Sequence, residues 1–207
     1  MAVELKLDHI VVSAARLEDG ITYVETALGV KMAPGGKHPA MGTHNALLGL
    51  GDAYLEVIAI DPDAPAPGYP RWFDLDNFVG SPRLTNWVVK CTDLSAALAL
   101  APDGAGRPMA LSRGDLHWTL AVSPEGTLPF DSGFPGFIDW GDTPHPATRL
   151  PDVGCRLQSV EVRHRQADGL RTALARFGGG LENWVGDVGP LGFRATVMTP
   201  GGTRVLA

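Results

Sequence analysis

The sequence is poor in cysteine and has no long apolar run. Its 207 residues include two cysteines, Cys91 and Cys155, which are too few for a disulfide framework. No apolar stretch approaches the length that crosses a membrane. The first residues, MAVELKLDHI, also lack the pattern of a secretion signal. These absences predict a cytoplasmic protein without a membrane partner.

Positive charge is also scarce. The 17 Lys and Arg residues against 23 Asp and Glu residues give a formal net charge of −6, whereas nucleic-acid binding needs a basic surface. The chain contains no GxGxxG, no P-loop and no Gly-x-Ser-x-Gly elbow, so nucleotide binding and serine hydrolysis are not indicated. The mean hydropathy of +0.03 is typical of a globular domain. We therefore expect a small-molecule ligand and no nucleic-acid partner.

One order of elements, a strand, a helix and three strands, occurs in residues 5–60 and 84–140 and recurs in residues 154–207, where two strands, 191–199 and 203–206, are recognised after the helix. A recurring order at a near-constant period indicates repeated modules even where residue identity is low. Apolar residues at helical spacing predict helices over residues 14–28, 93–100 and 168–177, the first capped by Ser13 and the second by Asp93. The predicted fold class is α+β, with two modules in residues 1–150 and a third in residues 154–207.

Two segments between the predicted strands have distinct compositions. Residues 34–42, PGGKHPAMG, are expected to form a loop. Residues 61–82 are rich in proline but carry four aromatic residues. We expect this connector to pack against the modules, over a pocket mouth, rather than to act as a linker.

The stretch 43–60 predicts two strands joined by a turn at Gly51-Asp52. Glu56 lies among apolar neighbours on the second strand, and a buried carboxylate is costly unless it is paired. Its partner could be a metal ion or a base, or its pKa could be shifted so that it stays neutral. On strand 7–12, strict alternation places His9 on one face and Asp8 on the other.

Aligned modules carry matching polar pairs. The opening strands set His9 against Asn86 and Ser159, and the closing strands set Glu56 against Asp139 and Leu206. The first two modules thus carry a polar pair and the third does not. We interpret the third module as structural, packed on its own chain's barrel or paired with a second chain in a homodimer.

The motifs LDHIVV (7–12), GTHNALL (42–48), YLE (54–56) and IDW (138–140) resemble the bacterial glyoxalase-like domain family of the vicinal-oxygen-chelate superfamily. The resemblance implies that two modules pair into an open barrel around a pocket. It also implies metal ligands on the first and last strands of each module, which correspond here to His9, Glu56, Asn86 and Asp139. The superfamily includes isomerases, dioxygenases, resistance enzymes and metal-free sequestering proteins, so the fold does not settle the function.

Two interpretations of the candidate residues stay open. His9 and Glu56 could hold zinc, manganese, nickel or iron, or could bond each other directly without a metal. For Asn86 and Asp139 a hydrogen-bonded structural pair is favoured over ligation. The remaining candidates are His44 as a second catalytic residue with Glu56, and a substrate-binding set of His38, Asn45, Trp87, Trp118 and Trp140. Loop, surface or core roles explain these residues equally simply, and His145 is expected at the surface.

The sequence therefore supports two functions. The first is a glyoxalase-like lyase or isomerase, dependent on a divalent metal, that acts on a substrate with vicinal oxygens. The second is a metal-free protein of the same fold that binds or sequesters a small apolar molecule.

Overall fold

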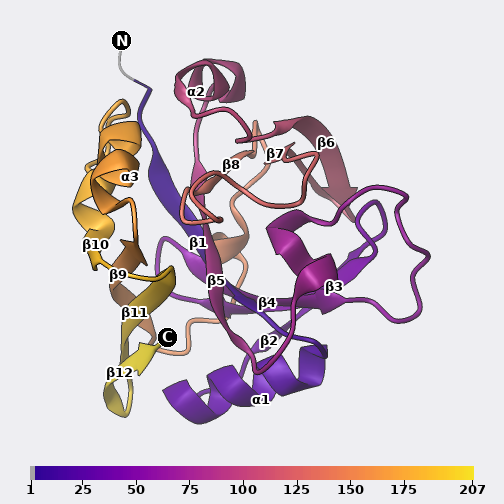
Figure 1. Cartoon of the computed structure of the whole chain (residues 1–207). Coiled ribbons are helices and arrows are strands. Elements are labelled where there is room, and N and C mark those ends of the chain that lie inside the picture. Colours follow the sequence, from indigo (N-terminus) through magenta and orange to yellow (C-terminus); the bar gives the residue numbers. More distant parts are fainter. Residues whose placement is uncertain (1–2) are drawn as a thin grey trace.

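The computed structural model describes residues 3–207 as two β-sheets with helices packed on them (Figure 1). The first module comprises β1 (Lys6–Ser13), α1 (Leu17–Leu28), β2 (Ala33–His38), β3 (Thr43–Gly49) and β4 (Tyr54–Ile60). The second comprises β5 (Arg83–Lys90), α2 (Leu94–Leu100), β6 (Arg107–Arg113), β7 (Leu116–Val122) and β8 (Gly136–Asp139). The third comprises β9 (Arg156–His164), α3 (Ala167–Leu174), β10 (Val185–Val188), β11 (Gly192–Thr199) and β12 (Gly202–Leu206). The predicted class, repeated βαβββ modules, is confirmed.

The first two modules form one eight-stranded sheet in the order β2-β3-β4-β1-β5-β8-β7-β6. They join where β1 and β5 pair antiparallel. The two edge strands approach each other. Nη1 of Arg113, at the end of β6, lies 3.2 Å from Nε2 of His38, at the end of β2. The sheet therefore curls into an open barrel whose inner face carries apolar side chains such as Val11, Ile58 and Val88.

The β1–β5 junction has an approximate two-fold symmetry. His9 pairs with Val88 and Val11 pairs with Asn86, so exchanging the modules exchanges His9 with Asn86. Each strand also carries one extra, unpaired residue, Asp8 in β1 and Thr85 in β5, at matched positions. Such β-bulges locally break the alternation of side chains.

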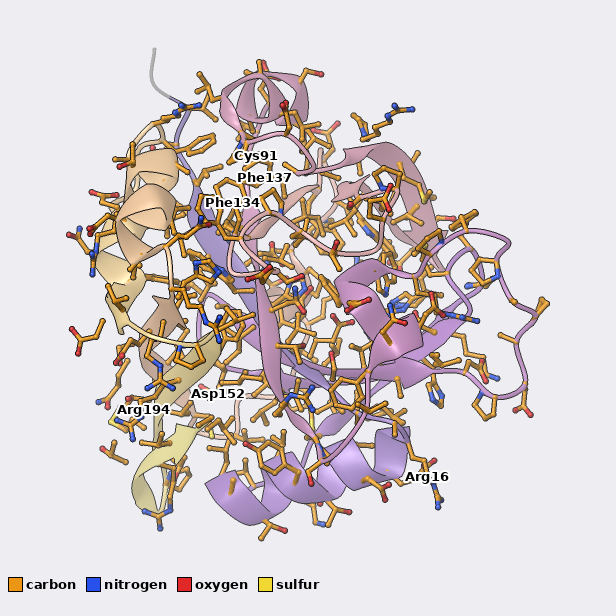
Figure 2. The ribbon with its side chains drawn as sticks, viewed as in Figure 1. Arg16, Cys91, Phe134, Phe137, Asp152 and Arg194 are labelled. Carbon is orange, nitrogen blue, oxygen red and sulfur yellow. The ribbon has the colours of Figure 1, made fainter. Side chains whose placement is uncertain are left out.

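The third module forms a separate four-stranded sheet in the order β10-β9-β11-β12 and packs on the outside of the barrel. The ring of Trp87 on β5 packs against that of Trp184, with 5.4 Å between centroids; Trp184 lies in the short helix η3 (Leu181–Trp184). Phe134 and Phe137 are fully buried in this interface, and Figure 2 shows them deep between α3 and the barrel. The module therefore packs on its own chain, and the homodimer stays a prediction.

Four details of the chain add to or correct the predicted elements. Strand β10 was not predicted, because its sequence VGDV is short and contains glycine and aspartate. Ser13 is not the cap of α1; that position is Arg16, which makes no side-chain cap bond, while Ser13 bonds Thr85 at 2.7 Å. Asp93 does cap α2, accepting the amide of Ala96 at 2.9 Å. No helix within residues 3–207 is long and apolar enough to cross a membrane.

The two segments singled out by composition also take definite structure. Strand β2 occupies much of the expected loop 34–42. The connector 61–82 includes the short helix η1 (Trp72–Asn77), whose Trp72 and Phe73 are buried against the open side of the barrel. The connector therefore packs onto the modules, as its aromatic content predicted.

Candidate functional site

A narrow pocket opens inside the barrel between the first two modules. Its free volume is about 40 Å³, and since one water needs roughly 10–15 Å³ on this scale, only a few waters fit. The side chains that give it chemistry are His9, His38, Asn45, Glu56, Arg113 and Trp118. These come from six strands, β1 to β4 of one module and the β6–β7 hairpin of the other.

The bulge in β1 puts Asp8 beside His9 instead of on the opposite face. The carboxylate of Asp8 lies 2.7 Å from Nδ1 of His9 and has no solvent exposure. It also accepts hydrogen bonds from Nε1 of Trp140 and Nε2 of His145, each at 2.8 Å. Nδ1 of His145 accepts a hydrogen bond from the amide of Ala147. The ring proton of His145 is therefore on Nε2, which donates the hydrogen bond to Asp8. Asp8 is therefore a buried anion with three donors.

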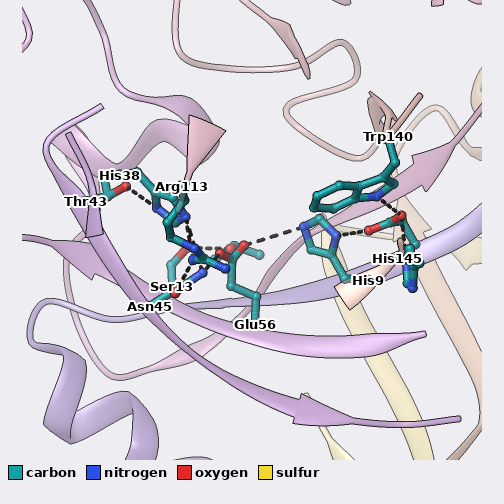
Figure 3. Close-up of polar contacts among 11 residues, drawn as sticks. His9, Ser13, His38, Thr43, Asn45, Glu56, Arg113, Trp140 and His145 are labelled. Carbon is teal, nitrogen blue, oxygen red and sulfur yellow. Dashed lines mark hydrogen bonds and ion pairs between the residues drawn. The ribbon is translucent and has the colours of Figure 1, made fainter. Parts of the chain in front are cut away.

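Glu56 continues this row of polar contacts on the other side of His9 (Figure 3). Its Oε2 lies 3.5 Å from Nε2 of His9, and its Oε1 accepts the Nδ2 amide of Asn45 at 2.6 Å. The Oδ1 of Asn45 in turn accepts Nη1 of Arg113 at 3.0 Å. Negative and positive groups thus alternate along the row, from Asp8 through His9 and Glu56 to Arg113.

The charges in the row fix each other. Burial alone would lower the pKa of His9, but hydrogen bonds and charge from Asp8 and Glu56 raise it to about 9. Burial would raise the pKa of Asp8, but its bonds from His145 and His9 hold the pKa well below the usual range. Burial would also raise the pKa of Glu56, but the hydrogen bond and positive charge of His9 outweigh it, so the pKa of Glu56 is lowered. The row at neutral pH therefore contains two carboxylates and an imidazolium.

His38 behaves in the opposite way. Burial, opposed by Glu56 and reinforced by the positive charge of Arg113, lowers the pKa of His38 to about 4. Its Nδ1 lies 3.1 Å from the hydroxyl of Thr43, and its Nε2 lies 3.2 Å from Nη1 of Arg113. Because Nη1 of Arg113 can only donate, Nε2 of His38 is the acceptor and the ring is neutral.

Two glycines of β2 make room for the row. A Cβ on Gly35 would lie 2.1 Å from Oδ1 of Asn45, and one on Gly36 would lie 2.7 Å from Cδ of Arg113. The amide of Gly36 also donates to Oδ1 of Asn45 at 2.8 Å. The Gly-Gly pair is therefore required by the close approach of Asn45 and Arg113.

Aromatic rings wall the pocket around these charges. Tyr54 stacks on the ring of His9 with 4.6 Å between centroids. Trp118 lies 5.5 Å from Trp140 and 6.3 Å from His38, and Trp72 closes the side nearest His38 at 5.3 Å. Burial raises the pKa of Tyr54, so its hydroxyl stays protonated. A ligand in the pocket would meet a charged floor and apolar walls.

The structure brings together most of the residues singled out from the sequence, and places four elsewhere. His44 faces out of the barrel, because its neighbour Asn45 faces in. Trp87 is a core residue whose Nε1 donates to the carbonyl of Gly133 at 2.9 Å. Asp139 faces outward and accepts the amide of Gly141. Asn86 faces inward but lines a different cleft.

The strand register corrects the expected counterpart of Glu56. Val11 pairs with Glu56 across β1 and β4, and its symmetry mate Val88 pairs with Gly136 across β5 and β8. The match is therefore Gly136, not Asp139. The segment before β8, with its left-handed residues 130–132, shifted the sequence alignment by three positions. The second module consequently offers Asn86 and a glycine where the first offers His9 and Glu56.

Sequence reasoning missed Asp8, Arg113 and His145. Asp8 was assigned to the opposite face because the bulge has no simple sequence signal. Arg113 was not singled out at all, and His145 was expected at the surface. The unusual Asp-His pair inside an apolar strand was the signal that could have identified Asp8.

Paired βαβββ modules curled around one pocket define a glyoxalase-like fold. Residues 7–178 match the family model described as a glyoxalase-like domain, and the chain belongs to that family. No curated protein matches the sequence significantly.

Several solved structures are similar in fold. A hypothetical protein from Staphylococcus aureus is 16% identical, with 83% of this chain and 74% of that chain covered and a TM-score of 0.58. Methylmalonyl-CoA epimerase from Mycobacterium tuberculosis is 20% identical, with 69% and 91% covered and a TM-score of 0.43. The Staphylococcus aureus protein shows that the fold is shared; at these identities the likeness extends no further.

The superfamily suggests a divalent metal, and the donor set does not fit one well. His9 and Glu56 supply two donors, while Asn86 lies in another cleft and Gly136 has no side chain. Within residues 3–207 no group of three His, Cys, Asp or Glu side chains is placed to hold a metal ion. Sites for zinc and similar ions take three or four protein ligands, and the nearby Arg113 adds positive charge. The side chains at these positions therefore do not make up the ligand set of such a metal site.

Proposed function

We propose that this chain is a small-molecule isomerase or lyase that moves a proton on a substrate with two neighbouring oxygens. The observation that carries the proposal is the row Asp8–His9–Glu56–Asn45–Arg113, which places a carboxylate between an imidazolium and a guanidinium inside an aromatic pocket. Such pairs of oppositely perturbed titratable groups in a cleft favour acid–base chemistry.

Each charged group has a role in this chemistry. The carboxylate of Glu56 removes a proton from a carbon next to a carbonyl group, and the C–H electron pair moves onto the carbonyl oxygen. His9 and Arg113 donate hydrogen bonds to the resulting oxyanion, which lets a carboxylate of lowered pKa act as the base. Return of the proton to a neighbouring atom gives an isomer, and loss of a leaving group gives a lyase product. Asp8 positions the ring of His9 and maintains its charge.

The proposal is tested by hydrogen exchange. The protein is incubated in D₂O with a panel of small 2-oxo acids and 2-hydroxy ketones, and deuterium at the carbon is followed by NMR. We expect Glu56→Gln to slow exchange about 10²-fold or more, as for other general bases. His44→Gln is the matched control, because His44 faces away from the pocket, and should exchange like the parent. Equal rates for parent and Glu56→Gln across every compound that exchanges would contradict the proposal.

The alternative function is metal-free binding or sequestration. It is favoured by the hydrogen bonds within the row, since Glu56, Asn45 and Arg113 already bond one another. A binding protein predicts that compounds of the panel perturb the ring signals of Trp118 and Trp140 without any exchange. Exchange that depends on Glu56 excludes this alternative.

The remaining expectations from the sequence are proposals as well. Binding of zinc, manganese, nickel or iron is measured on protein purified without chelators or a polyhistidine tag. A homodimer is tested by sedimentation. The division of the chain near residue 150 is tested by whether residues 1–150 remain folded alone, which the large buried interface around Trp87 and Phe137 argues against.

A further inference from the structure

We propose a second ligand site, in the cleft between β5 and β11, that binds a small molecule with a planar apolar body and one carboxylate. The cleft lies where the connector helix η1 and the third module meet the barrel, and it has a free volume of about 430 Å³. That volume is within the range of roughly 300–1,000 Å³ typical of ligand pockets. The site is independent of the proposed catalytic function.

Asn86 is the first observation that points to a ligand. Its side chain is 2% exposed and lines the cleft, yet its Nδ2 has no hydrogen-bond partner within residues 3–207. A buried amide without an acceptor is costly, and natural structures rarely keep one without a reason. Since Asn86 stands at the symmetry position of His9, the barrel holds a buried polar group at both matched places. An acceptor atom of a ligand would satisfy it.

Backbone strain is concentrated around the same cleft. Within residues 3–207, five residues other than glycine have a left-handed backbone, and four of them line the cleft: Phe73, Asp74, Asp131 and Ser132. Residues other than glycine rarely adopt this backbone conformation. Where they do, they cluster at ligand-binding and active sites. The strain comes from two separate segments, η1 and the loop before β8, that face each other across the opening.

Two arginine side chains at the mouth have free donors for an anion. Arg83 and Arg163 are exposed at the rim, from β5 and β9, and each uses only part of its guanidinium on backbone carbonyls. The acidic side chains of Asp74 and Asp131 at the rim already have partners, and Ala207, which also lines the cleft, accepts the hydroxyl of Tyr23 at 2.8 Å. Asp74 accepts Nδ2 of Asn77 at 2.7 Å, and Asp131 lies 3.2 Å from Nε2 of His164.

The walls favour a flat apolar body. Phe73, Phe78, Leu84 and Phe193 line the cleft, and the guanidinium of Arg83 lies 4.4 Å above the ring of Phe78. An aromatic ring fits between such walls, and its carboxylate would reach the arginines at the rim. An acceptor on the ring or the second carboxylate oxygen would take the amide of Asn86.

The site is tested with 2-naphthoate and the neutral 2-naphthamide, whose binding is followed by their own fluorescence. We expect 2-naphthoate to bind more tightly than the amide. The double variant Arg83→Gln with Arg163→Gln should weaken 2-naphthoate about tenfold or more, the scale of one charge-assisted contact, and leave the amide unchanged. Arg194→Gln is the matched control. Arg194 lies on β11, which borders the cleft, but it is exposed and does not line the cleft, so this variant should bind 2-naphthoate like the parent.

Asn86→Leu separates a ligand role from a structural one. If the amide serves a ligand, its replacement by an apolar side chain of similar size should weaken both probes while the thermal midpoint stays unchanged or rises. A structural amide would instead lower the midpoint. Failure of 2-naphthoate to bind, or binding that is lost in Arg113→Gln but kept in the cleft variants, would overturn the proposal.

Discussion

The first and second modules share one backbone arrangement but carry different chemistry at matched positions. In the first module, β1 and β4 present Asp8, His9 and Glu56. In the second, the register gives Thr85, Asn86 and Gly136 at the same places. His9 and Asn86 are almost equally buried, at 4% and 2% exposure, so burial does not distinguish them.

The difference lies in the partners. Asp8 and Glu56 flank His9 and keep it charged, whereas Asn86 keeps an amide without a partner among the described residues. The two modules thus share the strand pairing that forms the barrel, while a few residues at matched positions decide which module carries an acid–base group. One half contributes charge to the narrow pocket, and the other opens toward the larger cleft beside the third module.

Asp8→Ala should break the contrast most severely. It removes a buried anion that accepts hydrogen bonds from His9, Trp140 and His145, and leaves the His9 charge half-compensated. We expect a loss of about 3–5 kcal/mol in the free energy of unfolding, the usual cost of removing one partner of a buried pair. Denaturant unfolding measures it. A loss below about 1 kcal/mol would show that His9 is not held as a buried cation.

Glu56→Ala should have the next largest effect. His9 keeps Asp8 but loses its second carboxylate, and Asn45 loses its acceptor, so we expect about 1–3 kcal/mol of destabilisation. Thermal unfolding is repeated with added zinc and manganese. Stabilisation of the parent by an ion, absent in Glu56→Ala, would reveal a metal held by His9 and Glu56. A variant that matches the parent in stability and metal content would refute the site.

The pH dependence sharpens the contrast further, because only the first module carries a titrating pair at these positions. The folded pKa of His9, about 9, exceeds its ordinary value of 6.5. Its stabilising contribution is therefore complete below about pH 6.5 and is lost as pH rises through 9. The pKa values of Asp8 and Glu56 are lowered, so their contribution is present above about pH 4.5 and is lost in acid.

NMR of the imidazole ring tests this directly. We expect the His9 ring to titrate with a midpoint near 9 and Glu56→Gln to lower that midpoint, because one of the two stabilising carboxylates is gone. A parent midpoint near 6.5 would show that the ring does not lie between two anions.

The fold was largely predictable from the sequence because its signals are periodic. Apolar alternation and helical spacing recur three times, and they predicted the modules and the separate third module, whereas the pairing of the first two modules was implied by the resemblance to the glyoxalase-like family. Strand β10 was missed because four residues with glycine and aspartate carry no period. Glu56 was recognised for a physical reason, since a carboxylate in an apolar strand requires a partner.

The rest of the site depends on features that a linear pattern does not encode. The bulge places Asp8 beside His9, against strict alternation. Arg113 reaches the row because the two edges of the sheet meet, which is a property of the curled sheet. The shift from Asp139 to Gly136 arose from the irregular segment before β8.

Thr85→Ala is the smallest change and the matched counterpart of Asp8→Ala, because both residues are the extra residue of their bulge. Thr85 makes a single hydroxyl contact, to Ser13 at 2.7 Å, where Asp8 accepts three hydrogen bonds as an anion. We expect a loss of about 0.5–1.5 kcal/mol, the net value of one neutral hydrogen bond. A double-mutant cycle with Ser13→Ala isolates that bond. If Thr85→Ala cost as much as Asp8→Ala, the bulge geometry itself, rather than the buried charge, would account for both losses, and the chemical difference between the two modules would not explain their energetics.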